Sequence, residues 1–413
     1  MSYRGNVRRM YAFTALTHAF FWMPIWVLFL QGRGLSLGRI GGLEFGAMVL
    51  MAVAEVPTGT VADTWGRKTS LAIGAFLHGL ATLGVLAEVL SPVFLLAYAF
   101  WGASLTFLSG ASEALLYDSL KAEGDAAGYT HTASRMMTSG LVGLGAASLV
   151  GGLVAAVDPR LCFVLTSVAC FAGVGVALTL REPPAHDHTD ESVEQAVEQR
   201  AARYWSTLTA GVRLVTGHAR VRVVVLVGAA LDLFGTLLTM TAFQPYVDEV
   251  ALPVWTLGGI LLAIRVCAIA GSVLSPRVAD AIGREPVLVV AAAIMVGAQL
   301  VLWLGASRPA VALFALAAAA AALARPVVSA LLNDAIPSSQ RATCISLQSL
   351  VGNLGLGVVQ LALFLIADRT SMALALGLVG LLMAAVLLPL LVSLTGWRQG
   401  RLAGGLGLRS RVP

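Results

Sequence analysis

The chain has 413 residues, of which 58% are hydrophobic and only 12% are charged, and its mean hydropathy is +0.85. Soluble domains carry about 25% charged residues, so this composition excludes a soluble globular protein. The net charge of +5 is expected to reflect membrane topology, and nothing in the composition points to nucleic acid.

Twelve apolar stretches follow one another along the chain, and about 20 such residues suffice for a helix to cross a bilayer. The sequence predicts spans over residues 10–31, 37–61, 69–90, 93–117, 133–157, 161–180, 223–247, 254–278, 286–305, 309–333, 342–366 and 371–395. The only long polar break divides them six and six. We therefore expect an all-α membrane protein with two six-helix bundles, residues 1–180 and 223–396, a cytoplasmic linker, 181–222, and a cytoplasmic tail, 397–413.

The linker changes character along its length. From Ser192 to Val215 it is amphipathic at helical spacing, which predicts a helix lying on the membrane surface, with a regulatory role as the less favoured alternative. His186 and His188 lie beside acidic residues, but a solvated linker is favoured over a metal site. We expect no metal and no cofactor, and we expect the tail from Arg398 to be unstructured.

The distribution of positive charge predicts the orientation of the chain. Twenty of the 27 lysine and arginine residues fall at the N-terminus or in loops on its side of the predicted membrane, and five fall in the opposite loops. Positive loops stay in the cytoplasm, so both termini and the linker are expected there. The first apolar run is too long for a cleavable signal peptide and contains His18 and Pro24.

A short sequence occurs twice. Residues 59–68 read Gly-Thr-Val-Ala-Asp-Thr-Trp-Gly-Arg-Lys, and residues 276–285, 217 positions later, read Pro-Arg-Val-Ala-Asp-Ala-Ile-Gly-Arg-Glu. Residues 114–118 are similarly echoed by residues 330–334 at nearly the same spacing. The pattern indicates a duplicated membrane protein, and repeated halves around a midplane site are the architecture of secondary transporters.

Residues 59–68 resemble the loop 2–3 signature of the major facilitator superfamily, Gly-x-x-x-Asp-x-x-Gly-Arg-Lys/Arg. The resemblance extends over about residues 8 to 396, and residues 55–59, 112–118 and 336–343 are similar to a bacterial branch of that superfamily. It implies two bundles that rock about a midplane cavity, a small-molecule substrate, a location in the bacterial inner membrane, and a monomer.

The same resemblance implies a conformational latch at the cytoplasmic ends of the helices. Asp63 is expected to accept hydrogen bonds from the start of helix eleven near Arg341, and Arg67 is expected to pair with Asp118. The alternative is a pair of turns whose positive charges only keep these loops in the cytoplasm. The residues of the expected latch are Gly59, Asp63, Gly66, Arg67, Asp118, Asp280, Arg284, Asp334 and Arg341.

Ionisable residues inside predicted spans are costly in the bilayer and are therefore functional candidates. Asp232 lies about 14 Å from the cytoplasmic side and Arg265 about 16 Å from the outer side, both near the midplane. Burial disfavours the charged carboxylate and a nearby arginine favours it, so Asp232 is expected to carry a proton with Arg265 as counter-charge. A purely structural ion pair between them is the alternative.

Other ionisable residues fall at different depths. A packing role is favoured for His78. Two further candidates for proton coupling or the cavity are His18 and Glu44, and three candidates for the cytoplasmic gate are Glu55, Glu113 and Arg325.

These observations favour a secondary transporter that exports a small amphipathic organic molecule in exchange for protons. Helix five keeps Gly143, Gly151 and Gly152 of a pattern that the resemblance associates with antiporters, but has Ala147-Ser148 where those carry Gly-Pro. Uptake by symport or uniport therefore remains open. In other classes, a lipid scramblase or a multi-pass enzyme remains, although no cluster of catalytic residues supports an enzyme.

Overall fold

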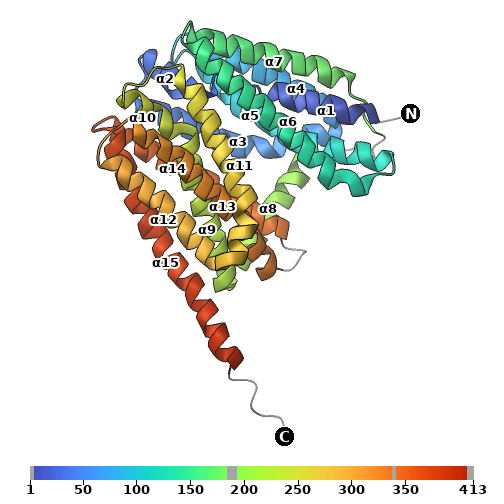
Figure 1. The fold of residues 1–413 in the computed structure, drawn as a ribbon. Helices are drawn as coiled ribbons and strands as arrows, with labels where there is room; N and C mark the ends of the chain where they lie inside the picture. The colour runs from blue at the N-terminus through green and yellow to red at the C-terminus, as the bar shows by residue number, and fades with distance from the viewer. Residues whose placement is uncertain (1–3, 184–192, 337–340, 407–413) are drawn as a thin grey trace. The chain divides into compact units, whose positions relative to one another are not determined.

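The computed structural model describes residues 4–183, 193–336 and 341–406, and these ranges contain helices and loops but no strand. The chain divides into two compact units (Figure 1). Unit 1 comprises Met1–Tyr204 with Pro253–Leu262, and unit 2 comprises Trp205–Leu252 with Ala263–Pro413. The division therefore falls inside the expected linker, and the short segment Pro253–Leu262 of the second half joins unit 1.

The helices of the first half are α1 (Arg4–Thr17), η1 (Met23–Ile25), α2 (Trp26–Gly32), α3 (Leu37–Thr64), α4 (Arg67–Gly84), α5 (Pro92–Ala122), η2 (Ala126–Gly128), α6 (Tyr129–Ala155) and α7 (Pro159–Thr179). Next comes α8 (Val193–Gly217). Those of the second half are α9 (Ala219–Thr236), η3 (Leu237–Ala242), α10 (Phe243–Glu249), α11 (Thr256–Ile282), α12 (Arg284–Trp303), η4 (Pro309–Val311), α13 (Ala312–Ala335), α14 (Arg341–Ala367) and α15 (Met372–Leu406).

The same packing pattern occurs in both units. In unit 1, α4 packs against α5 and α7, and in unit 2, α12 packs against α13 and α15 (Figure 1). The Thr58 hydroxyl donates to Thr106 (3.0 Å) between α3 and α5, and the Ser275 hydroxyl donates to the Leu323 carbonyl (2.7 Å) between α11 and α13. Positions 58 and 275, and positions 106 and 323, are both 217 apart, so the duplication extends to interhelical hydrogen bonds.

Ten described helices are long and apolar enough to cross a membrane, and the other two expected spans depart from that simple form. The first span, residues 10–31, is broken after α1. The Phe21 amide there donates to the Thr166 hydroxyl (3.0 Å), and Pro24 has no amide to continue a helix. The other, α4, has only 18 residues and begins with Arg67 and Lys68.

The two turns of the repeated sequence have the same backbone geometry. Gly66 and Gly283 are the N-caps of α4 and α12, with φ of 89° and 94° and ψ of 154° and 157°. A side chain is strained in this region of backbone conformation, whereas glycine is not. The glycine of each Gly-Arg pair is therefore required by the turn.

Glycines of α6 allow it to lie directly against the first span. A Cβ atom at Gly143 would collide with the carbonyl of Ala15, and one at Gly151 would collide with the carbonyl of Phe21. Helices in lipid gain from such close contact because small residues increase their packing area. Gly143 and Gly151 of the glycine pattern in α6 are thus explained by packing against the broken first span, whereas Gly152 lies against Trp255 and Gly258.

Two expectations for the polar segments are changed or refined by the structure. The tail was expected to be unstructured from Arg398, but α15 continues to Leu406, because helix propagates readily from an existing helix end. The amphipathic helix of the linker is present as α8. Trp205 and Val212 are exposed on it, whereas Gly211 lies against Thr343 at the start of α14.

Replacing Gly151 with alanine is expected to destabilise the protein by about 1–3 kcal/mol, since the added methyl group must push α6 away from the first span. Thermal unfolding in detergent measures this loss. Gly175→Ala on α7 is the matched control, because a Cβ there meets nothing within 4 Å. Equal stability of the two variants would contradict the packing explanation.

Candidate functional site

The repeated turn in unit 1 carries an ion pair. Arg67, the first residue of α4, pairs with the Asp118 carboxylate on α5 and also donates to the Ala114 carbonyl (2.8 Å). Both charged side chains are about two-thirds buried, with exposures of 28% and 32%. This contact was expected from the sequence. It ties the start of α4 to the end of α5.

The equivalent pair in unit 2 is more open. Arg284 donates to Asp334 at 2.6 Å, but the two side chains are 50% and 60% exposed. Exposed ion pairs contribute little to stability because water screens them and the side chains lose entropy. The second pair is therefore expected to hold its helices less firmly than the first.

Glu182 adds a contact that the sequence does not predict. Its two carboxylate oxygens accept from the backbone amides of Arg67 (2.7 Å) and Lys68 (2.8 Å). The carboxylate thus caps the first turn of α4, where unpaired amides and the helix dipole favour negative charge. The sequence offers one signal for this contact: Glu182 lies two residues after the predicted sixth span, which ends at residue 180.

The remaining latch and gate candidates are less constrained. Gly59 and Asp63 lie within α3, which runs to Thr64 and so extends beyond the predicted end at residue 61. The side chains of Asp63 and Arg341 lie outside the described residues, so their expected contact is not tested. Three acidic candidates are exposed and form no ion pair among the described residues: Glu55, Glu113 and Asp280.

The pairing expected for Asp232 is wrong. Its carboxylate accepts from Nε of Arg325 at 2.7 Å, and Arg265 is not its partner. The reason is that α9 packs against α13, although α11 is the next long helix in the sequence. Arg325 is ten residues from the end of α13, or about 15 Å along the helix, and pairs with Asp232; its role in the cytoplasmic gate stays a prediction.

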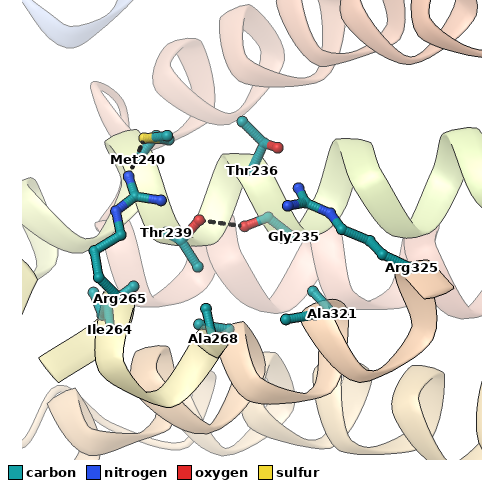
Figure 2. Close-up of a pocket in the computed structure, with 11 residues that line it drawn as sticks. Gly235, Thr236, Thr239, Met240, Ile264, Arg265, Ala268, Ala321 and Arg325 are labelled. Carbon is teal, nitrogen blue, oxygen red and sulfur yellow. Dashed lines mark hydrogen bonds between the residues drawn. The ribbon is translucent and has the colours of Figure 1, made fainter. Parts of the chain in front are cut away.

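A cavity of about 100 Å³ lies beside this ion pair in unit 2 (Figure 2). Its walls come from α9, η3, α11 and α13, and much of its surface is alanine and glycine. The polar groups in its lining are those of Thr236, Thr239, Arg265 and Arg325, next to the thioether of Met240. Asp232 does not line the cavity, but it is paired with Arg325, which does.

Arg265 is poorly satisfied in this cavity. Its Nη2 donates to Met240 Sδ at 2.7 Å, a weak acceptor, and its buried Nε has no hydrogen-bond partner among the described residues. The segment opposite is η3, a π-helix of six residues. Such wide turns occur often at functional sites.

The other sequence candidates lie in unit 1 and are not among the residues that line this cavity. Glu44 is buried and accepts from the indole of Trp26, which packs in an aromatic cluster with Trp22 and Tyr98. His18 is exposed at the break in the first span, beyond the end of α1.

His78 has the packing environment that was favoured for it. It is fully buried and hydrogen-bonded to Ser104 (3.0 Å). The described residues contain no group of three or more metal-ligating side chains. His186 and His188 lie outside the described residues.

Repeated helical halves and charged side chains within the spans are features of secondary transporters. Residues 10–355 match the sequence pattern of the Major Facilitator Superfamily. An uncharacterised MFS-type transporter, YxaM of Bacillus subtilis (strain 168), is 23% identical over 345 residues, covering 80% of this chain and 81% of that protein. The chain therefore belongs to the Major Facilitator Superfamily and is a multi-pass membrane transporter.

Solved structures share the fold at low sequence identity. The nucleoside transporter NupG has a TM-score of 0.72 at 14% identity, over 94% of this chain and 98% of that one. A D-xylose-proton symporter has a TM-score of 0.64 at 15% identity, over 92% of this chain and 97% of that one. At these identities the likeness extends to the fold alone.

Arg67→Ala and Asp118→Ala are expected to be non-additive, because each removes the same ion pair. We expect a coupling free energy of about 0.5–3 kcal/mol from thermal unfolding of the single and double variants. The matched cycle of Arg284→Ala and Asp334→Ala is expected to give a smaller coupling, because that pair is more exposed. Additivity at the first pair would contradict this interpretation.

Proposed function

We propose that this protein is a proton-coupled secondary transporter that moves a small organic molecule by alternating access, with Asp232 as the proton carrier. The observation that carries the proposal is the ion pair between Asp232 and Arg325 inside the membrane-spanning part of unit 2. Arg325 replaces Arg265 as the counter-charge in this proposal.

The ion pair offers two charge states that differ in what Arg325 can bind. Arginine does not lose its proton in proteins, so only Asp232 changes charge. While Asp232 is ionised, it accepts from Arg325. When it takes a proton, the guanidinium loses its ionic partner. An unpaired charge is costly within the bilayer, so the guanidinium then favours another acceptor. The 45% exposure of the Asp232 side chain is compatible with exchange of the proton.

Other charges on the neighbouring helices lie close to the helix ends. Besides Asp232, Arg265 and Arg325, the helices α9, α11 and α13 contain five charged residues: Arg220, Arg222, Arg277, Asp280 and Asp334. The three central residues are therefore the charged groups of these helices that lie deep in the membrane.

The latch is proposed to keep helix ends rigid while the transporter changes conformation. The pairing of Arg67 with Asp118 and the cap from Glu182 join the ends of α4, α5 and α7. A joined group of helix ends moves as one body, which alternating access requires. We place these contacts on the cytoplasmic side of the inner membrane, as the charge distribution predicts.

The direction of transport follows from how the proton and the substrate share the site. Export by exchange is the first candidate, supported by the glycines retained in helix five. Symport is the second, because protonation of Asp232 releases Arg325 for a substrate. The D-xylose-proton symporter is an example of the fold used for proton symport. Flux in proteoliposomes with and without a pH gradient separates coupled transport from uniport and lipid scrambling.

Asp232→Asn is expected to abolish transport driven by a pH gradient while leaving downhill exchange, because the amide cannot carry a proton. The measurement is accumulation of labelled amphipathic compounds by proteoliposomes under an imposed gradient. Asp248→Asn, at an exposed carboxylate of α10, is the matched control. If Asp232→Asn still concentrates a compound under the gradient, Asp232 is not the carrier, and Glu44 and His18 become the next candidates.

A further inference from the structure

The cavity in unit 2 contains more positive than negative charge. Two guanidinium groups, those of Arg265 and Arg325, line it (Figure 2), and the carboxylate of Asp232 neutralises only the second. Among the described residues, no ion pair includes Arg265. The cavity and its surroundings thus keep one positive charge without a partner.

Arg265 is also short of hydrogen-bond acceptors. A guanidinium has five N–H donors, but the contact to Met240 uses one of them on a weak acceptor, and the buried Nε has none among the described residues. Leaving a buried charged donor unsatisfied is costly, so this arrangement favours an acceptor from outside the protein. A planar carboxylate or a phosphate group matches the fork of guanidinium donors.

The size of the cavity limits what part of a ligand it holds. Its volume of about 100 Å³ exceeds the space of a single water molecule but is below the roughly 300–1,000 Å³ of pockets that enclose a whole drug-sized ligand. Alanine side chains, including Ala268 and Ala321, keep this space open between the two arginines. The cavity therefore accommodates a charged head group, and the body of the ligand lies outside it.

We propose that this cavity binds the anionic head group, carboxylate or phosphate, of an organic anion that the protein transports. The proposal rests on the proposed function, and it names the substrate class. Arg265 supplies the charge and donors that have no partner within the protein, and Arg325 contributes when Asp232 does not occupy it. The anion and the Asp232 carboxylate compete for Arg325, so the anion binds together with a proton. For an anionic substrate this competition favours proton symport, the second candidate above, over exchange.

The test measures binding to the purified full chain in lipid nanodiscs, without any gradient. The probes are phenylacetate and benzyl phosphate as anions, phenylacetamide as the neutral analogue, and phenethylamine as the cation. At least one anion is expected to bind about tenfold or more tightly than the amide and the amine. Tighter phenylacetate assigns the site to carboxylates, and tighter benzyl phosphate assigns it to phosphate monoesters.

Three variants test the site itself. Arg265→Gln is expected to remove the preference for anions, and Ala268→Leu is expected to remove it by filling the cavity without changing its charge. Asp232→Asn is expected to tighten anion binding, since it removes the competing carboxylate. Arg277→Gln is the matched control, because Arg277 is on the same helix but exposed near its end.

Equal binding of anions and amide, or an anion preference that survives both Arg265→Gln and Ala268→Leu, overturns the proposal. The outcome is separable from that of the proton-carrier proposal. Loss of anion preference in Arg265→Gln supports the anion site even if Asp232→Asn still shows pH-driven transport. Conversely, Asp232-dependent accumulation without anion preference retains the carrier and rejects the anion site.

Discussion

The hydrocarbon interior of a bilayer offers no hydrogen bonds, and this constraint determines where polar groups occur in the chain. Backbone amides are satisfied within helices, and at the break in the first span the Phe21 amide donates to the Ala19 carbonyl and to the Thr166 hydroxyl. Charged side chains deep in the helices occur beside a partner, as Asp232 does beside Arg325. Arg265 departs from the rule, and its unsatisfied guanidinium is what distinguishes the cavity from ordinary packing.

The duplication is retained in the turns and their ion pairs, but not in the charged residues within the spans. Gly66 and Gly283 have nearly identical backbone angles, and an arginine–aspartate pair follows each. Position 15, which corresponds to Asp232 at the 217-residue spacing, is an alanine. Turn geometry and helix packing are needed wherever the repeat occurs, whereas a charged cavity is needed only once.

The sequence predicts the fold and the repeated turns, because each depends on signals within a few residues or on a repeat. The contact of Arg67 with Asp118 is implied by the resemblance to the superfamily. It does not predict the partner of Asp232. Depth can be counted along a helix, but which helices are neighbours depends on bundle packing, which placed α13 beside α9. The cap from Glu182 and the π-helix of η3 were missed for a similar reason. Neither changes the hydropathy pattern, and the cap joins residues that are 115 positions apart in the chain.

The π-helix also fixes the rotation of the chain that follows it. A π-turn arises when an α-helix takes in an extra residue, and each residue of an α-helix turns the chain by about 100°. The inward direction of Phe243 and Tyr246, both fully buried, therefore depends on that additional residue. The Tyr246 hydroxyl accepts from the Ser307 amide at 3.3 Å, a contact that this rotation makes possible. Deleting one residue from η3 would leave the span nearly as apolar as before, yet it would rotate α10 so that a different set of side chains faced inward.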